Sequence, residues 1–65
     1  MRILVNGDSH EISAPTLAAA LFELGFHDRV VATALNGEFV AAHCRSNTQL
    51  SDGDRVEIVA PMQGG

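Results

Sequence analysis

The residues with the clearest chemical potential are the last two, Gly64 and Gly65, because they carry a terminal carboxylate on a backbone without Cβ atoms. Glycine lets the main chain approach another surface closely. Pro61 fixes φ and has no N–H donor, so it ends any strand that precedes it. The sequence therefore predicts a flexible tail over residues 61–65 that can enter a narrow channel and deliver its carboxylate to a distant active site.

The histidines and the cysteine do not form a recognisable catalytic or metal-binding set. His10, His27 and His43 are scattered without metal-ligand spacing and favour surface or loop positions. His43 precedes Cys44, but neighbours in sequence seldom have the geometry of a nucleophile and its base. Cys44 is therefore predicted to be a small filler of a loop or of the core.

Two further acids, Asp52 and Asp54, flank Gly53 and are more typical of a turn than of a calcium loop. The sequence shows no phosphate-binding glycine loop, no Ser-His-Asp set and no paired catalytic acids. We therefore expect a chain that is not an autonomous enzyme and that binds no metal or cofactor of its own.

The composition indicates one small globular domain of 65 residues, 46% hydrophobic and 18% charged. The single cysteine excludes an internal disulfide, and no stretch resembles a signal peptide or a membrane span, so we expect a cytoplasmic protein. The net charge of −4 argues against nucleic-acid binding and would suit a basic partner. Lysine is absent, so the chain offers no lysine side chain for self-conjugation.

The first half of the chain reads as a hairpin followed by a helix. Residues 2–6 and 9–13 favour two strands joined by an Asn6-Gly7 turn, with Ile12 facing inward. Thr16 is a plausible N-cap for a helix that ends at Gly25. The buried stripe of that helix is predicted to contain Leu17, Ala20, Leu21 and Leu24.

The second half reads as a hairpin, an irregular segment and a last strand. Residues 30–35 favour an interior strand, and Asn36-Gly37 turns it into a short strand over residues 38–40. Residues 41–49 lack a clear period and are expected to be irregular. Leu50 is expected to be buried in the core as a plug beneath the turn before the last strand. Residues 55–60 favour a strand with alternating polarity, with Val56 and Ile58 on one face.

Two hairpins flanking one helix suggest an α+β, ubiquitin-like β-grasp fold. The first and last strands pair in parallel at the centre of a mixed sheet of four to five strands, and the helix covers one face. The domain is predicted to span residues 1–60, followed by the tail of residues 61–65. Anchoring the tail on a central strand suits a domain that carries it.

Three stretches together resemble the ThiS family, the sulfur carrier proteins of thiamine biosynthesis. They are Val5-Asn6-Gly7, residues 31–38 (VATALNGE) and the run from Leu50-Ser51-Asp52 through Arg55-Val56 to Gln63-Gly64-Gly65, which is the most specific. The resemblance covers essentially the whole chain. Residues 41–44 depart from it, because they lack an aromatic residue that many members carry near there.

The resemblance implies that Gly65 is adenylated by a ubiquitin-activating-type adenylyltransferase that uses ATP. It also implies that Gly65 then becomes a thiocarboxylate with cysteine-derived sulfur and gives this sulfur to thiazole synthase, with Gly64 as the second residue of the motif. Adenylation gives the carboxylate a good leaving group, and a thiocarboxylate is a softer and stronger nucleophile than a carboxylate.

Other functions are compatible with the same features. The chain could be a sulfur carrier for molybdopterin or another metabolite, a protein-conjugating modifier, or a non-covalent β-grasp interaction module. For a carrier, we expect the acidic or apolar face of the sheet to dock the activating enzyme. Leu50, Phe39 and Val59 are the residues considered for this face, although each favours a packing role.

Overall fold

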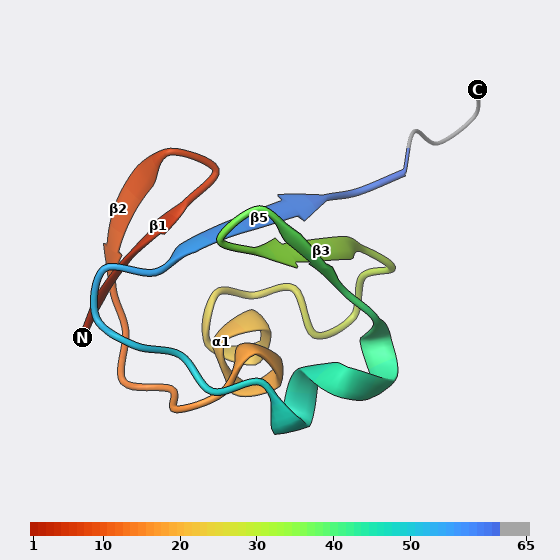
Figure 1. The fold of residues 1–65 in the computed structure, drawn as a ribbon. Helices are drawn as coiled ribbons and strands as arrows, with labels where there is room; N and C mark the ends of the chain where they lie inside the picture. Colours follow the sequence, from red (N-terminus) through yellow and green to blue (C-terminus); the bar gives the residue numbers. More distant parts are fainter. Residues whose placement is uncertain (62–65) are drawn as a thin grey trace.

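The computed structural model describes residues 1–61 and shows a five-stranded mixed sheet with a helix against one face (Figure 1). The strand order is β2-β1-β5-β3-β4. This is the predicted β-grasp arrangement. Within residues 1–61, no helix is long and apolar enough to cross a membrane. The elements are β1 (Arg2–Val5), β2 (Asp8–Glu11), α1 (Leu17–Glu23), β3 (Ala32–Leu35), β4 (Glu38–Val40), the 3₁₀ helix η1 (Ala42–Asn47) and β5 (Arg55–Val59).

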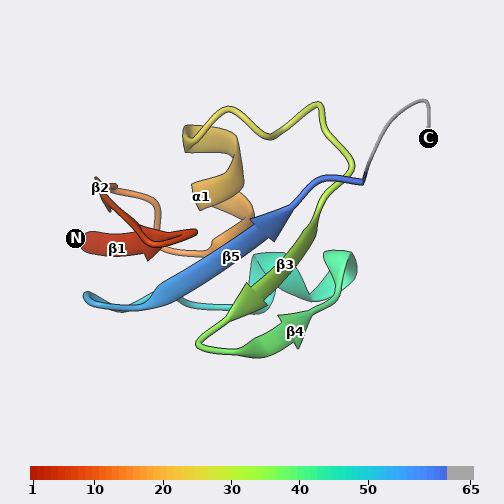
Figure 2. The ribbon, with the colours of Figure 1, turned by 90° about the horizontal axis from the view of Figure 1, so that it is seen from above.

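Strand β5 lies at the centre of the sheet, between β1 and β3 (Figure 2). It runs parallel to β1, with Val5 opposite Val56, and antiparallel to β3, with Ala32 opposite Val59. The predicted central pairing of the first and last strands is therefore confirmed. The segment that leads to the tail begins on a strand with a neighbour on each side.

Both predicted Asn-Gly turns are present, and both have the left-handed backbone that this dipeptide tolerates. Asn6 and Gly7 have φ values of 51° and 88°, and Asn36 and Gly37 have 50° and 88°. Positive φ at both central positions defines the turn whose twist matches that of the flanking strands. The two hairpins are thus set by local sequence.

Helix α1 begins and ends as the sequence indicates. The Thr16 hydroxyl oxygen accepts a hydrogen bond from the Ala19 N–H at 3.2 Å, as an N-cap should. At the other end, Phe26 N–H donates to Leu21 O at 2.8 Å and Gly25 N–H to Phe22 O at 3.1 Å. This pair of bonds is a Schellman ending with Gly25 in the left-handed conformation, and it folds Phe26 back toward the core.

The core lies between α1 and the inner face of the sheet. Leu17, Ala20 and Leu21 of the predicted helical stripe are buried, and Leu24 is half-buried against them. The sheet and its connections supply the other buried apolar residues, which are Ile3, Val5, Ile12, Ala14, Val31, Leu50, Val56 and Ile58. The alternation of β5 and the role of Leu50 as a core plug are confirmed.

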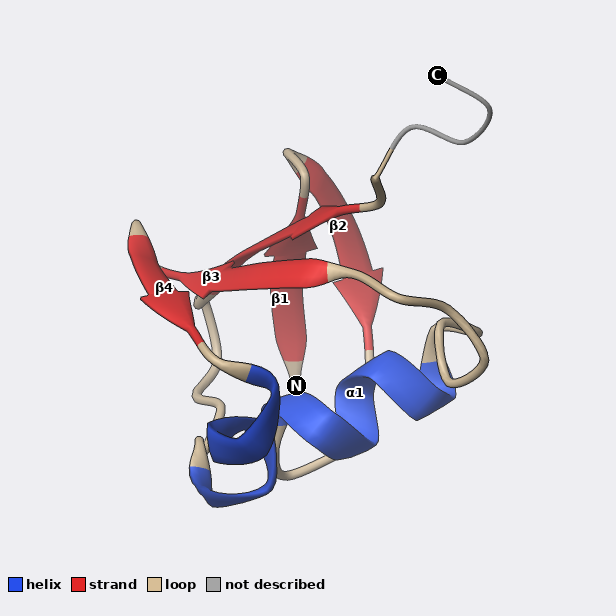
Figure 3. Ribbon diagram, turned by 90° about the vertical axis from the view of Figure 1, so that its right-hand side faces the viewer, coloured by secondary structure: helices blue, strands red, loops and turns tan. Residues whose placement is uncertain are grey.

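The expectation of an irregular segment over residues 41–49 is wrong, because Ala42–Asn47 forms the 3₁₀ helix η1 beside α1 (Figure 3). It has no buried apolar stripe that a periodicity argument could detect. Hydrogen bonds to residues distant in sequence attach η1 to the rest of the fold. The Arg45 guanidinium donates from Nη2 to Val31 O at 2.6 Å and from Nε to Thr33 Oγ1 at 2.9 Å. Helix α1 is therefore not the only helical element on this side of the sheet.

Several strand boundaries in β1, β2, β3 and β5 also differ from the prediction, each by one or two residues. Strand β3 begins at Ala32, because Val30 is 81% exposed and belongs to the connection from α1. Strand β2 ends at Glu11, although Ile12 still points inward and is buried. Apolar runs predict that a strand exists better than they predict its ends, because the partner strand decides where pairing stops.

Candidate functional site

The candidate site is the end of β5 and the surface beside it. Strand β5 ends at Val59, and Ala60 and Pro61 follow outside the strand, as the lack of an N–H on proline predicts. Gly64 and Gly65, the predicted reactive residues, lie outside the described residues. The structure therefore describes the base from which residues 62–65 continue.

The side chain of Asn6 holds β5 close to this end. Its Nδ2 donates to Ile58 O at 3.0 Å, and its Oδ1 accepts from Ile58 N–H at 2.8 Å. The backbone N–H of Asn6 donates to Val56 O at 2.9 Å. The carboxamide thus replaces the next peptide of β1 in the ladder, at the point where the chain turns away at Gly7. Sequence reasoning placed Asn6 at the end of the first strand and in the turn, and it missed this side-chain contact.

The other turn asparagine makes a related contact at the opposite end of β5. Asn36 Oδ1 accepts from Arg55 N–H at 2.9 Å, and its Nδ2 donates to Asp54 Oδ1 at 3.1 Å. Each Asn-Gly turn therefore contributes a side chain that is hydrogen-bonded to the backbone of β5. A carboxamide presents both a donor and an acceptor, as a peptide does. This property of asparagine could have suggested that the turn side chains bind the backbone of a neighbouring strand.

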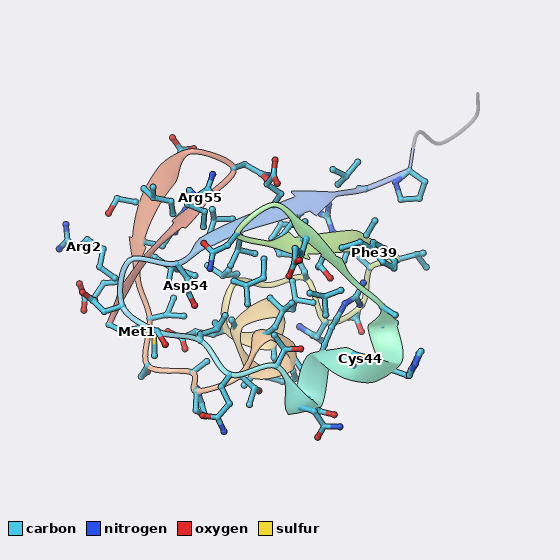
Figure 4. All side chains as sticks on the ribbon, in the orientation of Figure 1. Met1, Arg2, Phe39, Cys44, Asp54 and Arg55 are labelled. Atoms are coloured by element: carbon cyan, nitrogen blue, oxygen red, sulfur yellow. The ribbon has the colours of Figure 1, made fainter. Side chains whose placement is uncertain are left out.

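An apolar patch lies on the outer face of the sheet, away from α1. It is made of Ala32, Ala34, Phe39 and Val59, and together with Glu57 and the neighbouring Thr33 it lines a shallow hollow of about 190 Å³. Phe39, whose side chain is labelled in Figure 4, is 74% exposed, and Val59 is 62% exposed. The expectation that these two side chains favour packing is wrong. Leu50, by contrast, is buried in the core and does not contribute to this face.

The patch is exposed because β4 and the end of β5 have a helix on one side only. Strand alternation turns Val56 and Ile58 toward α1 and Val59 away from it, and Phe39 faces the same way because it pairs with Ala34. An exposed cluster of large apolar side chains is typical of a protein-binding surface.

The outer face is apolar rather than acidic. The register places Arg2, Glu11, Arg55 and Glu57 on it, so the charged strand residues there balance. Arg2 and Glu11 also form an ion pair at 3.2 Å. The net negative charge of the chain therefore comes from other parts of its surface. Of the two expected kinds of docking face, acidic or apolar, the outer face of the sheet fits the apolar kind.

The remaining reactive side chains stay apart. His10 is exposed on β2, His43 is exposed on η1, and the His27 ring lies 4.5 Å from the ring of Phe22. Cys44 is exposed on η1, so its predicted role as a loop or core filler is wrong. The 3₁₀ helix η1 buries none of its residues, and the side chain that attaches it to the rest of the fold is that of Arg45. Among residues 1–61, no three His, Cys, Asp or Glu side chains are grouped to hold a metal ion.

Asp52 and Asp54 serve the turn before β5. Asp54 Oδ2 accepts from Ser51 N–H at 2.7 Å, and Asp52 Oδ1 accepts from Arg2 N–H at 2.7 Å. Both carboxylates bind backbone donors, as turn acids do. The turn interpretation is confirmed.

A β-grasp sheet whose central last strand leads to a diglycine sequence defines the class of ubiquitin-like carrier proteins. Comparison with known families makes the assignment more specific. The ThiS family model matches residues 3–65. The chain therefore belongs to the ThiS family, the sulfur carrier proteins of thiamine biosynthesis, which act as carriers rather than catalysts.

Individual relatives agree with this assignment. The sulfur carrier protein ThiS of Thermus thermophilus is 38% identical over 63 residues, which cover 97% of this chain and 98% of the relative. A thiazole synthase of Paramagnetospirillum magneticum is 39% identical over 66 residues, and the chain spans only 20% of its length.

Solved structures show the same fold. The crystal structure of the thiamine biosynthesis protein ThiS from Geobacter metallireducens is similar over the full length of both chains, with a TM-score of 0.84 and 29% identity. A solution structure of a thiamine biosynthesis protein from the same organism has a TM-score of 0.80 at 29% identity and covers 100% of this chain and 88% of that one.

Proposed function

We propose that this chain carries sulfur as a thiocarboxylate on Gly65 for the formation of the thiazole ring of thiamine. The observation that carries the proposal is the central position of β5, the last strand before the diglycine sequence, and the exposed apolar patch beside its end. Family membership supplies the sulfur carrier role. The tail chemistry is the part that experiment must test.

The proposed reaction has two stages. A carboxylate oxygen of Gly65 attacks the α-phosphorus of ATP, a new C–O–P linkage forms and pyrophosphate leaves. A persulfide that holds cysteine-derived sulfur then attacks the carbonyl carbon and displaces AMP. A thiol cleaves the resulting S–S bond, so that the transferred sulfur remains on the carbonyl as a thiocarboxylate and the thiol is oxidised to a disulfide. Gly64 keeps the tail narrow enough to enter the partner's site.

The partners proposed from this chemistry are a ubiquitin-activating-type adenylyltransferase, a cysteine-derived sulfur donor and thiazole synthase. ATP is used by the adenylyltransferase and is not held by this chain. The thiazole synthase of Paramagnetospirillum magneticum supports the last partner, because one polypeptide with that name contains a segment similar to this whole chain.

The decisive experiment is intact-mass spectrometry after incubation with ATP, the cognate adenylyltransferase, a persulfide source and a thiol. We expect a mass gain equal to sulfur replacing oxygen, localised to Gly65 by fragmentation. A Gly65→Val variant should keep its fold and lose the modification. An unchanged mass with a demonstrably active partner would overturn the carrier chemistry and favour a non-covalent β-grasp module.

The apolar patch is the proposed docking surface for the adenylyltransferase, and two exposed phenylalanines provide a matched test. Phe39 lies on the patch, whereas Phe22 is 65% exposed on α1, on the other side of the sheet. We expect Phe39→Ala to weaken binding by about 1–2 kcal/mol, or roughly tenfold in Kd, because truncating an exposed aromatic anchor at an interface commonly has this effect. Phe22→Ala should bind as the parent chain does. Equal losses in the two variants, measured by calorimetry, would reject the patch as the docking surface.

A further inference from the structure

We infer that Asn6 is a positioning residue for the reaction of the tail. Its carboxamide makes the last hydrogen bonds on the β1 side of β5 before the chain leaves the sheet. The inference deepens the proposed function and rests on it. It concerns where the strand is held, and Asn6 itself touches neither ATP nor the reacting carboxylate in this proposal.

The argument begins with the unequal lengths of the two strands. The pairing of β1 with β5 includes Leu4 with Arg55 and Val5 with Val56, after which β1 ends. Strand β5 continues to Val59. On its β3 side the ladder continues with Ile58 and Val59. On its β1 side, two hydrogen bonds between the Asn6 side chain and the Ile58 backbone, one donated by each residue, replace those of the missing strand.

These two bonds make Ile58 the residue at which β5 is still held from both edges. Beyond it, Val59 is paired with Ala32 on one edge, and Ala60 and Pro61 lie outside the strand. The side chain of Ile58 is also buried in the core. Ile58 is therefore the anchor from which the direction of residues 59–61 is set, and Asn6 supplies half of that anchor.

Orientation affects the rate of a transfer reaction strongly when the reacting group sits at the end of a short segment. A misplacement of about 1 Å can lower a rate by about two orders of magnitude. Loosening the anchor should reduce the fraction of docked complexes in which the carboxylate reaches the α-phosphorus of ATP. It should change docking less than orientation, because Ala32, Ala34 and Phe39 of the apolar patch lie on β3 and β4. Val59, the fourth residue of the patch, stays paired with Ala32 of β3.

The chain offers a matched control in Asn36. It has almost the same φ as Asn6, it precedes a glycine in the same kind of turn, and its side chain also bonds the backbone of β5. The contact is at Arg55, at the start of the strand rather than at its end. Asn6→Gly and Asn36→Gly both keep the positive φ that the turns require and remove only the side chain.

The test is the steady-state rate of ATP-dependent pyrophosphate release with the cognate adenylyltransferase, a persulfide source and a thiol, which consume the adenylate and allow turnover, measured well below the Tm of every variant. We expect Asn6→Gly to lower kcat by about tenfold with KM changed less than twofold, as follows when orientation is disturbed more than docking. Asn36→Gly should leave both constants within twofold of the parent chain. Amide exchange at Ile58 should accelerate in Asn6→Gly and stay unchanged in Asn36→Gly.

Asn6→Asp provides a second variant if Asn6→Gly fails to fold. It keeps the Oδ1 acceptor for Ile58 N–H and loses the donor to Ile58 O, so we expect a kcat between those of the parent and of Asn6→Gly. Equal kcat values for the Asn6 and Asn36 variants, or a change confined to KM, would overturn the inference alone. A parent chain that releases no pyrophosphate with an active partner would overturn the proposed function, and the inference with it.

Discussion

Removing the Arg45 guanidinium should destabilise the whole domain, although Arg45 lies in a segment that the sequence left without structure. Arg45 Nη2 and Nε donate two hydrogen bonds to Val31 O and Thr33 Oγ1, and these bonds join η1 to β3 and to the residue just before it. Thr33 is only 2% exposed, and its hydroxyl donates onward to Val40 O at 2.9 Å. The guanidinium is thus the first member of a chain of bonds that links η1, β3 and the end of β4.

The magnitude follows from the number and kind of the bonds. Hydrogen bonds that involve a charged group contribute about 1.5–3 kcal/mol each when buried, and partial exposure of Arg45 lowers this contribution. We therefore expect Arg45→Met, which keeps an apolar stem, to lower the free energy of unfolding by about 2 kcal/mol. For a domain of this size, that corresponds to a fall in Tm of about 8–16 °C.

Thermal and urea unfolding would measure the effect, with Arg55→Met as the control. Arg55 is exposed on β5, and exposed substitutions of this kind change stability by about 0.5 kcal/mol or less. If Arg45→Met unfolded with the same Tm and urea midpoint as Arg55→Met, the tether between η1 and β3 would not stabilise the fold. The placement of η1 would then need another explanation.

Two further predictions concern the helix and the thiol. Thr16→Ala should cost about 1 kcal/mol in urea unfolding, because the Ala19 N–H loses its side-chain acceptor, whereas Thr16→Ser keeps the oxygen and should unfold close to the parent midpoint. Loss of stability in the serine variant as large as in the alanine variant would argue against the cap. Cys44 should react with iodoacetamide in the folded protein, because it is exposed on η1, and the product should still fold. Labelling that requires denaturant would contradict the exposed position.

The predictions from sequence succeeded where short-range chemistry decides the structure. An Asn-Gly pair favours positive φ in any context, and Thr16 with Gly25 marks the ends of a helix through contacts with its own backbone. The alternation of Val56 and Ile58 shows which face of β5 is buried. The tail residues 62–65 remain a prediction from sequence, because they lie outside the described residues.

The predictions failed where a distant partner decides the outcome. The 3₁₀ helix η1 is attached by bonds from Arg45 to Thr33 of β3 and to Val31 just before it, and neither residue type nor period in residues 41–49 reveals them. Phe39 and Val59 were assigned to packing because large apolar residues are usually buried. They are exposed because both helical elements lie on the opposite face of the sheet (Figure 3).

The sequence by itself therefore determined the local turns, the helix ends, the central strand and the diglycine sequence that place this chain among sulfur carriers. Only the tertiary structure decided which apolar residues face solvent beside β5. It also decided that the side chains of Asn6 and Asn36 form hydrogen bonds with the backbone of this strand. The physical reason is the range of the interactions. Backbone preference and periodicity act over a few residues, whereas the contact between Asn6 and Ile58 joins positions 52 residues apart and exists only after the sheet has formed.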